Sequence, residues 1–200
     1  MKKRAFLLGL IYAFLFSSCA SSMVPGEEIV VEKSASRKPS WILVPPRNTE
    51  EVLYFVGMAT HAPSLEKGKE MARANAAAQV AQFFGTKVNY SYTSSYQYGT
   101  SSGEDDYVSA FTNVMASKMI KGLTLEDLYY EKVKYADVNG VVRVGYNVYA
   151  LYSIGKTSFE KIADESISEV DEKFKSSGAY ETMKARREAL LKELDELLGR

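Results

Sequence analysis

The chain contains one cysteine and one histidine, and these side chains are the first candidates for chemistry. Cys19 follows Phe16-Ser17-Ser18, so an apolar residue and two small ones precede the only thiol. A bacterial lipoprotein signal has this form, although its first position is usually leucine and Leu15 here lies one place earlier. The cysteine of such a signal is acylated and becomes the first residue of the mature chain. We therefore expect Cys19 to carry lipid, including palmitate; the alternative is an ordinary cysteine at the end of a signal peptide.

The segment before this cysteine has the order of a secretory signal. Lys2, Lys3 and Arg4 form a positive start, and Ala5–Phe16 is an apolar run of 12 residues. A helix needs roughly 20 apolar residues to cross a bilayer, so this run is too short to serve as a membrane span. We expect residues 1–18 to be a signal peptide that is removed. One acyl chain anchors a protein only marginally, but the two or three chains of a lipoprotein give stable anchoring.

His61 is expected in the loop between the first main strand and the first helix, directly after Gly57–Thr60. A histidine in such a loop could act as a general base or bind a ligand. However, a metal site needs several ligands, and the mature sequence has no second histidine and no unmodified cysteine. The sequence also lacks a G-x-S-x-G motif and a glycine-rich phosphate loop. We expect no catalytic residue, metal or cofactor, and we retain His61 as a possible partner-binding residue.

The overall charge argues against a nucleic-acid partner. The chain has 25 basic and 25 acidic residues, and loss of the three cations of the signal leaves a formal charge of −3. A mildly acidic protein has no basic surface for phosphate groups. The composition, 46% hydrophobic and 12% aromatic, is sufficient for a core, and no second segment of membrane length follows the signal. We expect one domain of usual size attached to a membrane by its N-terminal lipid.

The mature chain divides into three parts by composition. Residues 19–40 are rich in Ser, Glu and Lys, and we expect a lipidated flexible tether with a possible short strand at Ile29–Val31. Such a tether has a root-mean-square reach of roughly 25 Å. Residues 41–155 carry the patterns of an α+β domain, and residues 156–200 are expected to be helical.

The spacing of apolar residues predicts the order of elements. Strands are expected at 51–59, at 86–98 and on both sides of Asn139-Gly140, and helices at about 64–84 and at 107–121. Ser64 is the expected N-cap of the first helix, and Gly85 its expected end. This order predicts an α+β fold, with a mainly antiparallel sheet of about four strands, helices packed on one face, and C-terminal helices after it.

The predicted strand at 86–98 contains an unusual series of tyrosines. Val88, Tyr90, Tyr92, Tyr96 and Tyr98 alternate with polar residues, which is typical of a half-buried antiparallel strand. We expect the first three to face the helices. The Tyr96 and Tyr98 end lies next to a polar loop, so we expect it to emerge from the sheet as a possible partner-binding site.

The C-terminal residues predict two helices separated by Ser176–Gly178. Buried positions of the first helix are expected at Phe159, Ile162, Val170 and Phe174. The second helix has a short heptad pattern with Arg187 in one core position; the other core positions are Tyr180, Met183, Leu190, Leu194 and Leu197. We favour packing of this helix on its own domain, and pairing with another subunit is the alternative.

Several stretches in this order resemble the LPP20 family of bacterial lipoproteins. They are Pro39–Ile42, Tyr54–Ala59, the alanine-rich helix Met71–Phe84 and the Asn139-Gly140 hairpin with Tyr146–Ala150. The resemblance covers roughly residues 39–155, and Leu123–Tyr130 fits it less well. The match rests on the order of these motifs behind a lipoprotein signal.

Proteins of the LPP20 family are outer-membrane or surface lipoproteins, mostly without an assigned activity. Related domains occur in flagellar basal-body accessory proteins that form rings or disks. The resemblance implies no catalytic residues. It agrees with a membrane-anchored envelope lipoprotein, in the outer membrane, that acts as a non-catalytic binding or assembly module.

Two alternative functions remain open from the sequence. One is a flagellar basal-body accessory lipoprotein, and the other is an envelope enzyme or small-ligand receptor that uses the His61 loop. Ala20 and Ser21 after the cysteine carry no aspartate retention signal, which favours the outer membrane where that rule applies. The sequence names neither the envelope partner nor the side of the membrane that the domain faces.

Overall fold

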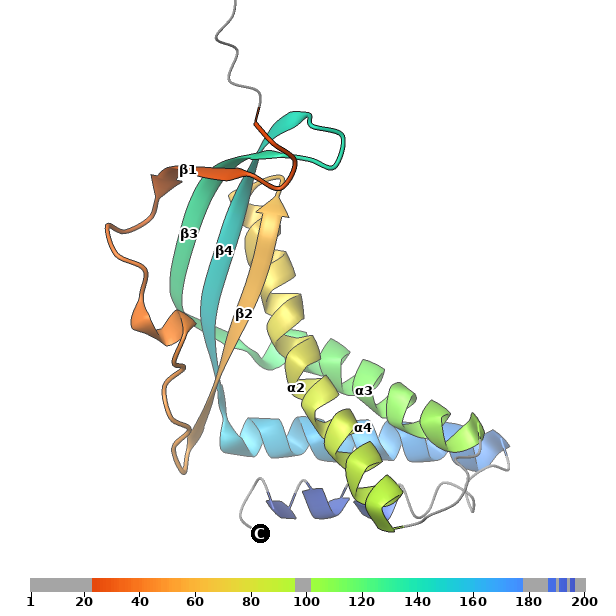
Figure 1. The fold of residues 1–200 in the computed structure, drawn as a ribbon. Helices are drawn as coiled ribbons and strands as arrows, with labels where there is room; N and C mark the ends of the chain where they lie inside the picture. Colours follow the sequence, from red (N-terminus) through yellow and green to blue (C-terminus); the bar gives the residue numbers. More distant parts are fainter. Residues whose placement is uncertain (1–22, 96–101, 178–186, 190, 194, 197–200) are drawn as a thin grey trace, which may run out of the picture.

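The computed structural model describes residues 23–95, 102–177, 187–189, 191–193, 195 and 196. The elements are β1 (Glu28–Lys33), the short 3-10 helix η1 (Ser40–Ile42), β2 (Val52–Ala62), α2 (Leu65–Ser95), α3 (Ser102–Gly122), β3 (Thr124–Ala136), β4 (Val142–Gly155) and α4 (Lys156–Ser177). The strands form one sheet and the long helices pack against it (Figure 1). The predicted α+β fold with a mainly antiparallel four-stranded sheet is confirmed.

The sheet has the strand order β1-β3-β4-β2, and each neighbouring pair is antiparallel. Strands β3 and β4 form a hairpin closed by residues 137–141, in which Gly140 has φ +74°. The Gly140 N–H donates to the Asp137 carbonyl at 2.9 Å, and the Asp137 carboxylate accepts from the Asn139 N–H at 2.9 Å. The predicted hairpin at Asn139-Gly140 is therefore confirmed.

Helix α2 begins at the predicted cap and lies very close to β2. The Ser64 Oγ accepts a hydrogen bond from the Lys67 N–H at 3.2 Å, as an N-cap residue does. About two turns further, the carbonyl of Ala72 and the buried side chain of Ala76 lie over Gly57 of β2. A Cβ at Gly57 would overlap the Ala72 carbonyl, so the helix backbone rests directly on the strand.

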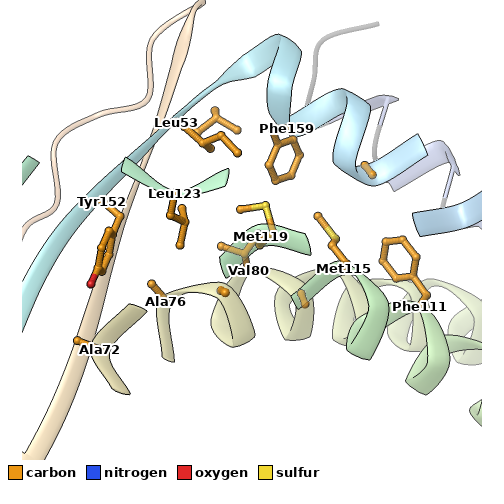
Figure 2. Close-up of a cluster of buried hydrophobic side chains, with 14 of the residues drawn as sticks. Leu53, Ala72, Ala76, Val80, Phe111, Met115, Met119, Leu123, Tyr152 and Phe159 are labelled. Atoms are coloured by element: carbon orange, nitrogen blue, oxygen red, sulfur yellow. The ribbon is translucent and has the colours of Figure 1, made fainter. Parts of the chain in front are cut away.

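The main hydrophobic core lies between the sheet and the three long helices. Figure 2 shows Phe111, Met115 and Met119 of α3 gathered with Val80 of α2 and Phe159 of α4. The aromatic rings and both methionines in this group are fully buried. Unbranched methionine side chains fill irregular spaces well, which suits a site where three helices meet the end of a sheet.

The prediction of a strand at 86–98 is wrong for residues 86–95, which the structure describes as part of a helix. Helix α2 continues through Gly85 to Ser95 and packs along α3. A mid-helix glycine costs only about 1 kcal/mol, which packing against another helix offsets. The spacing also allowed a helix, because Val88 and Tyr92 are four residues apart. Tyr96 and Tyr98 lie outside the described residues.

The ordered sheet starts earlier than the predicted domain boundary at residue 41. The possible strand at Ile29–Val31 is confirmed as part of β1, which pairs antiparallel with β3 along its length. Six residues of the expected flexible tether therefore belong to the sheet. Trp41 is buried in η1, as expected for the start of an ordered segment, and packs on the sheet face opposite the long helices.

The C-terminal region agrees with the prediction as far as it is described. In α4, Phe159 and Val170 are buried, and Ile162 and Phe174 pack partly buried against the core. Most of the predicted second helix, with its other heptad positions, lies outside the described residues. Arg187 is described, and its Nε donates to the carboxylate of Asp171 in α4 at 2.6 Å.

The close contact of α2 with β2 gives a direct test of the fold. We predict that Gly57→Ala lowers the free energy of unfolding by about 2–3 kcal/mol, since overpacking against a backbone carbonyl cannot be relieved by a side-chain rotation. The measurement is urea unfolding followed by Trp41 fluorescence. Gly155→Ala is the matched control, because a Cβ there meets only the Ser158 Oγ at 4.0 Å. Equal stability of the two variants would contradict the observed packing.

Candidate functional site

Among the predicted site residues, only His61 lies in the described part of the chain. Cys19, Tyr96 and Tyr98 fall outside the described residues, so their roles stay predictions. His61 was expected in a loop, but β2 extends to Ala62 and includes it. The pairing of β2 with β4 is irregular at this place, between Ala59 and Ala62.

The backbone of His61 has a conformation that is rare for residues with a side chain. Its φ is +54°, in the left-handed region. The His61 N–H donates to the Asn147 Oδ1 at 3.0 Å instead of a strand carbonyl. Gly145 lies opposite, and a Cβ there would approach the His61 Cα to 3.0 Å. The irregular end of β2 thus depends on one side-chain amide and one glycine of β4.

Contacts around the His61 side chain join residues from all four strands. Its ring stacks on Tyr135 of β3, with centroids 3.8 Å apart and planes 6° from parallel. Its Nε2 lies 2.7 Å from the Glu28 Oε2 of β1, and the Glu28 Oε1 accepts from the Asn147 Nδ2 of β4 at 2.8 Å. We call Glu28, His61, Tyr135 and Asn147 the His61 cluster.

The chemistry of the His61 cluster favours a structural role. A histidine beside a carboxylate is also found in catalytic sites, but both partners here are already used to connect strands. No group of three or more His, Cys, Asp or Glu residues that could hold a metal occurs in the described part of the chain. The cluster links Glu28, on the edge strand β1, to β4 and to β2 at the opposite edge of the sheet.

Strand β1 presents an open edge beyond this cluster. It pairs with β3 on one side, and in the described residues no strand pairs with its other side. Its three central side chains are exposed, with relative accessibilities of 47% for Ile29, 39% for Val30 and 47% for Val31. We call the unpaired side of Glu28–Lys33 the β1 edge. Unpaired backbone groups next to exposed β-branched side chains form a ready surface for strand addition.

The half of the sheet next to the β1 edge has a partly open face. Helix α2 packs mainly on β2 and β4, away from β1 (Figure 1). In one row across the sheet, Ile29 of β1, Lys134 of β3 and Val144 of β4 are direct neighbours, and all three are exposed. The β1 edge is therefore continuous with a mixed apolar and basic surface.

A second cluster covers the face of the sheet that is turned away from the long helices. Trp41 packs on Tyr129 and Leu151, and its Nε1 donates to an Asp127 carboxylate oxygen at 2.7 Å. The Tyr129 hydroxyl donates to the Glu131 Oε1 at 2.8 Å. Burial, and then the neighbouring Glu131, raise the pKa of Tyr129 to about 12. These groups satisfy one another, so this cluster also has a structural role.

An apolar cavity of about 280 Å³ lies at the start of β2. Its lining comes from β2, α2, α4 and the loop before β2: Asn48, Leu53, Phe55, Gln79, Val80, Phe83 and Phe159. The cavity is at the opposite end of β2 from His61. It contains no titratable side chain, so its lining offers no acid, base or charged group for a reaction.

Comparison with protein-family models, with curated proteins and with solved structures finds no match to this chain. The resemblance to the LPP20 family therefore stays a prediction from the quoted motifs. Among the described residues, no helix has both the length and the apolar character needed to cross a membrane.

Sequence reasoning singled out His61 but missed its partners. The composition around Glu28 predicts a tether, and Asn147 is a single polar residue within an apolar strand pattern. A buried asparagine in such a strand was the available signal, because a buried amide requires hydrogen-bond partners. The open β1 edge was indicated by the short apolar run at Ile29–Val31, whose position in the sheet the sequence does not reveal.

The His61 cluster predicts a local effect of Asn147. Replacement by Ala removes the acceptor of the His61 N–H and a donor to Glu28, so we expect a loss of about 1–3 kcal/mol in unfolding free energy. Hydrogen exchange should also become faster at the amides of β1. The control is Asn113→Ala, on the exposed side of α3, which should change stability by less than about 0.5 kcal/mol. Unchanged exchange in β1 would contradict the role assigned to the cluster.

Proposed function

We propose that the protein is a lipid-anchored envelope lipoprotein whose domain acts as a non-catalytic binding or assembly module. The single observation that carries the binding part is the open β1 edge, with its exposed Ile29, Val30 and Val31. The anchoring part rests on the sequence around Cys19. We place the protein in the outer membrane, in agreement with the residues after this cysteine.

The position of the β1 edge in the chain supports this proposal. Glu28, its first residue, is nine positions after Cys19. At no more than about 3.5 Å per residue, the edge lies within roughly 30 Å of the expected anchor. A protein held at a membrane meets partners at a raised effective concentration, which favours weak edge-to-edge contacts. An interaction surface close to the expected lipid anchor therefore suits assembly at a membrane.

The alternative of an enzyme or ligand receptor at His61 has less support. The His61 ring is held between Tyr135 and Glu28, and its backbone N–H is bound to Asn147. In the described residues the hydrogen bond of the ring goes to Glu28, and no candidate nucleophile is hydrogen-bonded to it. A flagellar role rests on the family resemblance, and no feature of the described residues favours it specifically.

Acylation gives the first test of the proposal. We predict that Cys19→Ala moves the protein out of the membrane fraction and abolishes incorporation of labelled palmitate, because the only acylation site is removed. Ser18→Ala is the matched control, since it keeps a small residue before the cysteine and should remain anchored. Membrane retention and labelling of the Cys19→Ala variant would refute the anchoring part.

Photo-cross-linking gives the second test. We predict that a photoreactive amino acid at Val30 captures a protein in intact cells, because this side chain lies on the β1 edge and is exposed. The same amino acid at Val138, 92% exposed in the β3–β4 loop, is the control and should give little product. An equal, low yield at both positions would refute the binding part.

A further inference from the structure

We propose that the β1 edge pairs with the β1 edge of a second copy of this chain, in an antiparallel arrangement that joins two sheets into one. This inference rests on the proposed function, because it names the partner of that same edge. It starts from the segment Glu28–Lys33, EIVVEK, whose two end residues carry opposite charges.

The hydrogen bonds of β1 to β3 show which backbone groups point to the open edge. The Glu27 carbonyl accepts from the Ala136 N–H, and the Ser34 N–H donates to the Tyr130 carbonyl, so Glu27 and Ser34 both face β3. Backbone groups alternate along a strand that has one antiparallel neighbour. The adjacent residues Glu28 and Lys33 therefore direct their N–H and C=O groups to the open edge.

A β-bulge makes this arrangement possible. Five positions separate Glu28 from Lys33, so in a regular strand they would face opposite edges and opposite sides of the sheet. The pairing with β3 shifts by one residue between Val30 and Glu32, which reverses the alternation. A bulge often protects an edge strand from pairing. Here it brings both charged end residues to the same edge and the same sheet face.

One register satisfies these constraints. When Glu28 faces Lys33 of the second copy, two-fold symmetry places Lys33 opposite the second copy's Glu28. Two cross-strand ion pairs then flank an apolar centre formed by Val30 and Val31 of both copies. A shift of one residue in one direction places Glu28 against Glu32, and this like-charge pair offsets the contact that Lys33 would then make with Glu27. A shift in the other direction places Lys33 against Ile29, so both ion pairs are lost.

The contacts already made by Glu28 are compatible with this pairing. Its two carboxylate oxygens are bound to His61 and Asn147, and a carboxylate has about four acceptor positions. The His61 cluster draws this carboxylate toward β4 and β2, so the long Lys33 side chain of the second copy must reach over β1 to the acceptor positions that remain. In the paired strands the two Glu28 residues lie about 17 Å apart, so tethers of up to roughly 30 Å let both cysteines enter one membrane.

Disulfide trapping in membranes of cells that make the full chain tests this register. In the variant Ile29→Cys with Glu32→Cys, each new thiol faces its counterpart in the second copy, and mild oxidation should give a disulfide-linked dimer. Within one chain these positions are about 10 Å apart, too far for a disulfide. The only native cysteine is expected to be acylated. The register control, Ile29→Cys with Val31→Cys, should give at least fivefold less dimer.

Charge reversal tests the ion pairs. Lys33→Glu in the trapping variant should reduce the yield of dimer about tenfold, because both flanking contacts become repulsive. Lys67→Glu makes the same charge change at an exposed position of α2 and should leave the yield unchanged. An equal effect of both reversals, or preferential trapping by the register control, would overturn the inference.

The photo-cross-link at Val30 separates this inference from the proposed function without relying on a cysteine variant. A product that contains only this chain supports self-pairing. A product with a different protein overturns the inference and leaves the binding function standing. The absence of any product at Val30 refutes both.

Discussion

The fold depends on the close contact between α2 and β2 at Gly57. Because no side chain separates the strand from the Ala72 carbonyl, the helix axis lies low over β2 and β4. The helix then runs beyond the sheet, where it packs with α3, and α3 packs with α4 around Phe111, Met115 and Phe159. The three long helices thus lie over one edge and one end of the sheet. The opposite edge, β1, receives no comparable cover within the described residues.

An edge strand without a helix over it needs another source of stability, and the His61 cluster supplies one. Glu28 lies on β1, yet its two oxygens contact residues of β4 and β2, beyond the neighbouring strand β3. These contacts require the left-handed backbone at His61, which costs about 1–2 kcal/mol. The hydrogen bond from its N–H to Asn147 and the ring contact with Tyr135 offset this cost. The strain is thus explained by the position of β1 and requires no catalytic role.

The parts of the fold that the sequence predicted are those decided by local interactions. Ser64 caps α2 through a hydrogen bond to a residue three positions later, and Gly140 closes a hairpin with the left-handed conformation that glycine adopts easily. The extension of α2 through Gly85 accompanies packing with α3, the next helix in the chain, and this is a tertiary contact. The His61 cluster depends on strand order, since Glu28 and Asn147 are 119 positions apart. Neither could be derived from periodicity.

The charges of β1 have two physical effects that act together. Glu28, Glu32 and Lys33 surround three exposed β-branched residues, and charged residues on an edge strand oppose indiscriminate pairing with other strands. The same charges favour a partner whose sequence places a lysine opposite Glu28 and an acid opposite Lys33. A second copy in the antiparallel register meets this condition, because the segment is complementary to itself.

The bulge between Val30 and Glu32 adds a geometric condition, since a partner strand must follow the same local bend. Specificity at this edge therefore comes from the combination of charge order and backbone shape, while the exposed apolar side chains supply the area that is removed from water.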